Sequence, residues 1–196
     1  MRYCKRPEAS LRGLLMATWL VAALALAPTA RGAEPGITIV TAKVRLQNDI
    51  YVIDADVDYV LNKELMRAVD AGVPLTFEVE AGFTHERKYL WDETVAGVVQ
   101  RMRLEYHALS KQYLVSNLST QTQQSFPTLE DALRKLGEIR RMAIVEKRFI
   151  KPASSYKAKI HVALEIEALP APMRPLAYLS LDWRFRSNWY KWTFVP

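Results

Sequence analysis

Three carboxylates at alternate positions are the first residues in the sequence that could do chemistry. Asp54, Asp56 and Asp58 alternate with apolar residues, so an extended strand would carry all three on one face, about 7 Å apart. Such a row could bind calcium or supply paired catalytic carboxylates. A calcium site, however, takes six or more oxygen ligands, usually from a loop, which a straight strand cannot supply alone. The other interpretation is a solvated strand face, partly neutralised by Lys43.

The histidines and the possible nucleophiles form no recognisable catalytic or ligand pattern. His85, His107 and His161 are far apart, and neither His-x-x-x-His nor Glu-x-x-His spacing occurs. The sequence has no Gly-x-Ser-x-Gly elbow, and only five glycines follow residue 32, which disfavours a phosphate-binding loop. We therefore expect no catalytic residue of these kinds, no metal and no cofactor.

Aromatic residues gather near the C-terminus. A two-residue turn at Ser187-Asn188 would give one aromatic face, built from the cross-strand pairs Phe185–Tyr190, Trp183–Trp192 and Leu181–Phe194. That face would close the core, whereas Trp189 would lie on the opposite, polar face near Arg184 and Arg186. These three residues are candidates for binding a glycan, a lipid or a partner peptide through stacking, cation–π and anion contacts.

The first 32 residues have the pattern of a secretory signal peptide. Four basic residues precede an apolar run from Leu14 to Ala27, and small residues follow that run. The run is short for a membrane span, and we expect cleavage near residue 32. This predicts a single β-rich domain over residues 33–196 in the periplasm or another extracytoplasmic compartment. The alternative is an uncleaved segment that anchors the domain to the inner membrane.

The signal segment also accounts for most of the positive charge. It carries five of the 27 lysines and arginines and one of the 21 acidic residues, so its removal lowers the net charge from +6 to +2. A nucleic-acid partner is therefore not expected. Cys4 is the only cysteine and lies in the same segment, so the remaining chain has no disulfide and no thiol ligand. After cleavage we expect no membrane span.

The clearest element is a hairpin that would position the three aspartates. Residues 40–46 and 51–57 alternate between apolar and polar side chains on either side of Asn48-Asp49. A two-residue turn there predicts the pairs Leu46–Tyr51, Val44–Ile53, Ala42–Ala55 and Lys43–Asp54. A slip of one residue would move the apolar side chains to opposite faces.

The remaining chain predicts more strands and two short helices. The helices cover 63–71, capped by Asn62, and 129–136, capped by Thr128. Further strands are expected at 75–83, 94–109, 113–117 and 156–168, with 139–145 left open between helix and strand. Residues 119–127 are expected to be a mobile connector, and 170–175 a rigid crossover. The predicted fold class is mostly β (α+β): an antiparallel β-sandwich-like domain of about eight strands with two short crossover helices.

Several segments together resemble a known family of exported proteobacterial proteins. They are Ala71-Gly-Val-Pro-Leu-Thr-Phe77, Trp91-Asp-Glu93, Tyr106-His-Ala-Leu-Ser110, Leu169-Pro-Ala-Pro-Met-Arg-Pro175, and Trp183 followed by Trp189-Tyr-Lys-Trp192. The family is a domain of unknown function, DUF4390. The resemblance implies a bacterial envelope setting and a gene neighbourhood that includes a sensor histidine kinase. It implies no activity, cofactor or catalytic residue.

These features favour a non-enzymatic binding or adaptor domain. Its partner would be an envelope or inner-membrane protein, or an envelope ligand, with Trp189, Arg184, Arg186 and the aspartate face as candidate contacts. One alternative is a hydrolase or lyase that acts on envelope polymer through Asp54, Asp56 and Asp58. Another is a lipid-handling protein with a cavity between its sheets.

Overall fold

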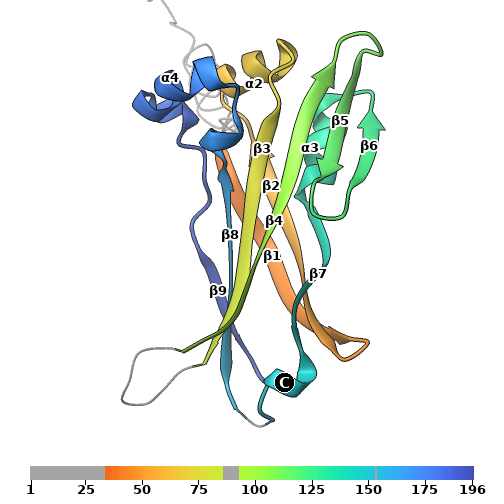
Figure 1. Ribbon diagram of the computed structural model, residues 1–196, viewed down its shortest axis with the longest axis vertical. Coiled ribbons are helices and arrows are strands. Elements are labelled where there is room, and N and C mark those ends of the chain that lie inside the picture. Colours follow the sequence, from red (N-terminus) through yellow and green to blue (C-terminus); the bar gives the residue numbers. More distant parts are fainter. Residues whose placement is uncertain (1–33, 86–92, 153) are drawn as a thin grey trace, which may run out of the picture. The chain divides into compact units, whose positions relative to one another are not determined.

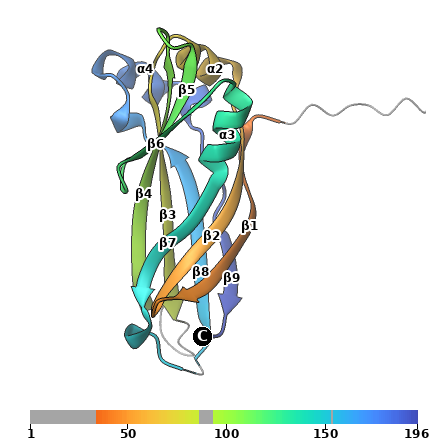
Figure 2. The same ribbon diagram turned by 90° about the vertical axis from the view of Figure 1, so that its right-hand side faces the viewer.

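Two antiparallel sheets packed face to face form the framework of the domain (Figures 1 and 2). The computed structural model describes residues 34–85, 93–152 and 154–196. The expected signal peptide, its cleavage point and Cys4 lie outside these ranges. Within them, no helix is both long enough and apolar enough to cross a bilayer.

The smaller sheet has three strands, and the larger sheet has six. The smaller sheet has the order β1 (Gly36–Gln47), β2 (Ile50–Val60), β7 (Glu138–Glu146). The larger has the order β6 (Thr122–Phe126), β5 (Gln112–Asn117), β4 (Glu93–His107), β3 (Leu75–His85), β8 (Tyr156–Leu164), β9 (Tyr190–Phe194).

Three α-helices and four short 3-10 turns connect the strands in the described ranges. The helices are α2 (Lys63–Asp70), α3 (Leu129–Gly137) and α4 (Arg174–Leu179). The turns are η1 (Lys147–Phe149), η2 (Ile166–Ala168), η3 (Ala171–Met173) and η4 (Leu181–Trp183). The predicted mostly-β, sandwich-like α+β fold is confirmed, with nine described strands where about eight were expected.

The first hairpin has the predicted register. Leu46 pairs with Tyr51 and Lys43 with Asp54. Asn48 and Asp49 both have positive φ angles, 50° and 59°, as a two-residue turn that follows the twist of the strands requires. Asparagine and aspartate tolerate this conformation better than most residues, so the local sequence determines the turn.

The start of β1 departs from the expected alternation. A bulge shifts the register between Ile39 and Thr41, and Val40 within it is 57% exposed instead of facing the core. The extra residue reverses the phase of the alternation. Ile37 and Ile39 before the bulge, and Ala42 after it, therefore all face inward.

Both predicted helix caps are present. The Asn62 side chain accepts a hydrogen bond from the Leu65 N–H at 2.8 Å, and the Thr128 hydroxyl accepts one from the Asp131 N–H at 3.1 Å. Helix α3 runs directly into β7, so the segment that the sequence left open between helix and strand is a strand (Figure 2).

The expected mobile connector at residues 119–127 contains strand β6, so that prediction was wrong. The Asn117 side chain accepts hydrogen bonds from the N–H groups of Ser119 and Thr120, at 2.9 and 3.0 Å, which tightens a turn. The chain then pairs back along β5, with Gln123 opposite Ser116. The first four residues of β6 are polar and exposed at the edge of the sheet, so this part of the sequence shows no apolar alternation.

The expected C-terminal hairpin is also wrong. Ser187 does not turn the chain, because its N–H donates to the Val162 carbonyl at 2.8 Å and its hydroxyl accepts from the Val162 N–H at 3.0 Å. Residues 185–187 and β9 therefore follow the free edge of β8 one after the other. This pairing satisfies backbone groups of β8 that a separate hairpin would leave open. β8 itself ends at Leu164, short of the predicted 168.

Aromatic contacts between the two sheets organise the core. Tyr59 on β2 meets Phe77 on β3 with ring centroids 5.1 Å apart, and Tyr51 meets Phe83 at 6.5 Å. Phe77 and Phe83 are fully buried. Edge-to-face aromatic pairs of this kind add about 0.5–1.5 kcal/mol each beyond simple burial. Phe185 joins this cluster 6.5 Å from Phe77, buried as the sequence predicted although not in the predicted pairing.

Candidate functional site

Asp54 is buried within the three-stranded sheet. It is 4% exposed, forms an ion pair with Arg45, and accepts a hydrogen bond from the Arg141 N–H at 2.8 Å. Arg141 has a φ of +53°, in the stretch of β7 where the pairing with β2 shifts register. The carboxylate thus holds a bulge in β7 in place. The expectation that all three aspartates share one solvated face is wrong for Asp54.

Asp56 is exposed but already has partners. Its carboxylate pairs with the Arg140 guanidinium and accepts a hydrogen bond from the Thr41 hydroxyl at 3.0 Å. The hydrogen bond from Arg140 is the main reason that the pKa of Asp56 lies below its usual value, and Thr41 adds to the effect while partial burial opposes it. Asp56 is therefore ionised at neutral pH and is a poor general acid.

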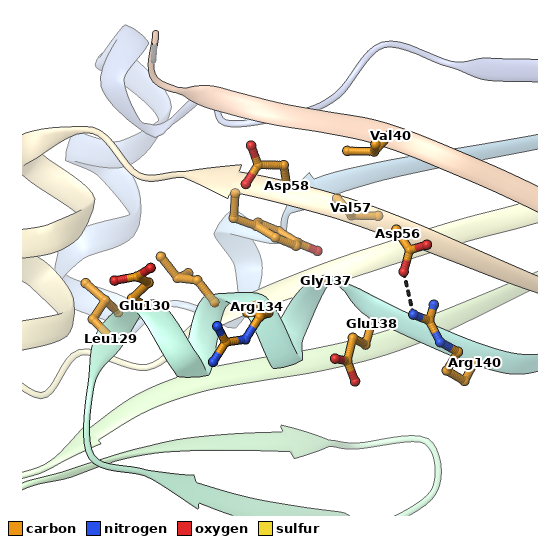
Figure 3. A pocket seen from close by; sticks show the side chains of 12 residues that line it. Val40, Asp56, Val57, Asp58, Leu129, Glu130, Arg134, Gly137, Glu138 and Arg140 are labelled. Carbon is orange, nitrogen blue, oxygen red and sulfur yellow. Dashed lines mark hydrogen bonds and ion pairs between the residues drawn. The ribbon is translucent and has the colours of Figure 1, made fainter. Parts of the chain in front are cut away.

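Asp56 and Asp58 both line an open groove between β2 and α3, with a volume of about 680 Å³ (Figure 3). Apolar, acidic and basic side chains all contribute to its walls. The lining residues are Val40, Asp56, Val57, Asp58, Tyr59, Leu129, Glu130, Leu133, Arg134, Gly137, Glu138 and Arg140.

The junction of α3 and β7 shapes this groove. Glu138 pairs with Asp56, and the β2–β7 ladder stops there. Gly137, just before it, touches the backbone of Val57 so closely that a Cβ would overlap the carbonyl oxygen. From Val57 to Val60 the ladder of β2 continues only with β1, while α3 lies on the other side of the groove.

The charges in the groove are partly neutralised from within. Arg140 pairs with Asp56, and Glu138 pairs with Lys135 at 3.0 Å. Asp58 and Glu130 have no ion pair or hydrogen bond with another described residue, and Figure 3 shows their carboxylates on opposite walls. The groove can therefore accept a cationic group between these two carboxylates.

A second cluster lies on the outer face of the larger sheet, around Trp189. The Trp189 ring is 39% exposed and stacks on His161, with centroids 4.9 Å apart and planes 25° apart. The ammonium of Lys159 lies 4.6 Å from the centre of the same ring. The sequence correctly left Trp189 outside the core; the cation beside its ring is Lys159.

Positive charge collects around this ring. Lys159 on β8 is the register partner of Lys191 on β9. Arg186 forms an isolated antiparallel β-bridge with Ala163, further along β8. We call Lys159, His161, Arg186, Trp189 and Lys191 the Trp189 surface. Beside it, a pocket of about 290 Å³ is lined by Thr84, Lys157, Lys159, Lys191, Trp192 and Thr193.

The carboxylates of Glu80 and Glu78 both lie near enough to this surface to raise the pKa of His161. Glu80 is 3.9 Å from the Lys159 ammonium and is the register partner of His161. Desolvation lowers the pKa of His161 most, Arg186 lowers it further, and Glu80 opposes both. His161 is therefore neutral at pH 7, and the lysines and arginine carry the positive charge.

The structure separates the six sequence candidates into three places. Asp54, Asp56 and Asp58 belong to the smaller sheet, whereas Trp189 and Arg186 lie on the larger one. Arg184 is exposed and lies just after η4. The lysines at 157, 159 and 191 were missed as site residues. The alternation of side chains placed these lysines on the outward faces of their strands, which could have marked them as candidates. Only the pairing of β9 with β8, however, brings them together.

The three histidines are apart in the fold as they are in the sequence. His85 packs against Tyr156, His107 Nδ1 lies 2.9 Å from the Ser110 hydroxyl, and His161 lies under Trp189. Among the residues that the structure describes, no three His, Cys, Asp or Glu side chains gather as a metal ion would require.

Comparison with known proteins gives one match. The family model described as a domain of unknown function (DUF4390) matches residues 34–193, which includes both candidate sites. Searches of curated proteins and of solved structures found nothing that matches. The match covers most of the chain and agrees with the resemblance of its C-terminal segments, so the chain belongs to the DUF4390 family.

Proposed function

We propose that this chain is an exported, non-catalytic binding protein of the bacterial envelope, which holds a partner protein through the Trp189 surface. The observation that carries the proposal is the pairing of Lys159 with Lys191 beside an exposed tryptophan. Like charges directly opposite each other destabilise a sheet. An acidic segment of a partner would relieve that repulsion.

The chemistry of the Trp189 surface suits a protein partner. Tryptophan and arginine are the residues that most often dominate binding energy at protein interfaces. Arg186 and Trp189 are both exposed here, and their contacts with β8 position them before binding. Acidic side chains of the partner would meet Lys159, Arg186 and Lys191, while an apolar side chain would cover the ring.

Export is supported by the sequence that precedes the domain. A basic segment and an apolar run precede residue 33, and the described domain contains no cysteine. The gene context implied by the family resemblance makes a membrane sensor histidine kinase the first partner to test.

The two alternative functions have less support. The hydrolase alternative needs carboxylates that share a site, yet Asp54 is buried in an ion pair and Asp56 pairs with Arg140. The lipid alternative needs space between the sheets. Fully buried side chains such as Phe77 and Phe83 fill the region between them.

The test is in-cell crosslinking of the tagged full chain in its native host. We expect one dominant membrane protein in the captured material, identified by mass spectrometry. Lys191→Glu should abolish its capture, because the substitution reverses a charge at the centre of the Trp189 surface. Trp189→Ala should abolish it as well.

The control is Lys147→Glu, which reverses the charge of another exposed lysine, on η1. This variant should capture the partner as the unchanged chain does. Equal loss in the η1 variant, or no captured protein above background with any variant, would overturn the proposal.

A further inference from the structure

Exposed apolar side chains gather at one end of the sandwich. This end is formed by α2, α4, η4 and the β4–β5 turn, which lie together in Figures 1 and 2. Leu176 is 64% exposed, Leu179 84% and Leu181 76%, and half-exposed Tyr178 lies among them. We call these four residues the apolar tip. Monomeric proteins rarely expose such a group without a binding role.

The same end is where the chain enters the domain. Gly36, at the start of β1, pairs with Val60, which is followed by Leu61 and then by Asn62, the cap of α2. The Asn62 amide donates a hydrogen bond to the Asp182 carbonyl in η4 at 2.6 Å. The chain entry at Gly36 is therefore linked to the apolar tip through the end of β2, the cap of α2 and η4.

The sequence before this point contains the apolar run that ends at Ala27. Six residues separate it from Glu34, the first described residue. An extended chain spans at most about 3.6 Å per residue, so this link reaches no further than about 25 Å. Any membrane that holds the apolar run is therefore within that reach of the chain entry.

We infer that the apolar tip docks into the headgroup region of the membrane, with the sandwich standing end-on to the bilayer. The inference rests on the export proposed above, in the alternative in which the apolar run is not cleaved and anchors the domain to the inner membrane. Leucines and a tyrosine on a short projecting element are suited to the interface, where apolar side chains enter the lipid and polar tips stay hydrated.

Contact between apolar side chains and lipid drives this docking, because the charges around the tip nearly balance. The surrounding elements carry five basic and four acidic residues: Lys63, Arg67, Lys111, Arg174 and Arg184 against Glu64, Asp70, Glu167 and Asp182. The interaction should therefore depend little on salt or on anionic lipid, unlike that of a polybasic membrane segment.

This orientation also relates the tip to the Trp189 surface. Arg186 bridges to Ala163, one residue before the end of β8, and β8 ends toward η2 and α4. A partner held at the Trp189 surface would thus be close to the bilayer, as a membrane protein must be.

The test uses the full chain reconstituted with vesicles of phosphatidylethanolamine and a minor share of phosphatidylglycerol. Cys4 is replaced by serine, and a single cysteine at Leu179 or at Phe149 carries an environment-sensitive fluorophore. Phe149 is 60% exposed and lies at the opposite end, where the Lys147 N–H donates a hydrogen bond to the carbonyl of Asp49 in the β1–β2 turn. We expect a blue shift and quenching by lipid-attached quenchers at 179, unchanged in high salt, and neither effect at 149.

Two double variants distinguish lipid contact by the apolar tip from membrane attachment through the apolar run alone. Leu176→Glu with Leu181→Glu should abolish the blue shift at 179, because two charges cannot enter the apolar region. Leu46→Glu with Val195→Glu, at exposed positions of the opposite end, should leave it unchanged. The inference is overturned if labels at 179 and 149 respond alike, or if the tip variant keeps the shift. Cell fractionation reports export separately, so failure of export is distinguished from failure of docking.

Discussion

Gly137 lies so close to β2 that a Cβ built on it would be 1.9 Å from the carbonyl oxygen of Val57. This contact joins the C-terminal end of α3 to the point where β7 begins to pair with β2. It therefore sets both the change from helix to strand and the width of the groove that Asp56 and Asp58 line.

Replacing Gly137 with alanine should destabilise the domain. The new Cβ would overlap backbone atoms of Val57, so either α3 or β2 must move. Overpacking of this kind costs about 1–3 kcal/mol. Urea unfolding of Gly137→Ala measures the loss. Gly97→Ala is the matched control, because a Cβ at Gly97 meets nothing within 4 Å. Equal stability of the two variants would show that the Gly137 contact is not restrictive.

Removing the Asp54 carboxylate should cost more stability than removing that of Asp58. Asp54→Ala leaves the Arg141 N–H without its acceptor in a partly buried setting, a loss of about 1–3 kcal/mol. Asp58 is exposed, so Asp58→Ala should change stability by less than about 0.5 kcal/mol. Asp54→Asn keeps an acceptor oxygen and should fall between them. Denaturant midpoints of the three variants check the order, and a harmless Asp54→Ala would contradict it.

The Asp56–Arg140 ion pair should stabilise the fold only at pH values at which the Asp56 carboxyl is ionised. The pKa of Asp56 is lower in the folded state than its usual 3.8. Its contribution is therefore fully present above pH 3.8 and is lost as the pH falls through the folded value. Arg140→Gln should raise the pKa of Asp56 toward 3.8, as followed by carbon NMR of the carboxyl group. Thr41→Val removes a smaller cause and should raise it less; an unchanged pKa in both variants would refute this assignment.

Removing the Trp189 ring should raise the pKa of His161. Desolvation is the largest cause of the lowered value, and Trp189 stacks directly on the imidazole. Because the folded pKa lies below the usual 6.5, folding stability decreases as the pH falls from 6.5 through the folded value. Trp189→Ala should weaken this dependence, and proton NMR titration of His161 measures the shift. Glu80→Gln should move the pKa further down, the opposite direction.

The local elements of this protein could be predicted from sequence because their causes are local. Asn48 and Asp49 favour the turn conformation, and one register alone puts the apolar residues of β1 and β2 on a single face. Asn62 and Thr128 cap helices through bonds to residues three positions away. The mostly-β composition of the fold follows from the same alternation of side chains.

The arrangement of strand edges depended on partners distant in the chain, and only the tertiary structure decided it. Residues 185–194 alternate as a hairpin would, but β8 offered them an open edge whose backbone groups need partners. β6 formed for the same reason along β5. These pairings decided which charges meet: they placed Lys191 opposite Lys159, whereas the β7 bulge drew Asp54 into the sheet. The sequence by itself thus determined the elements and which faces are apolar, while the edge pairing of the sheets decided which side chains form a site.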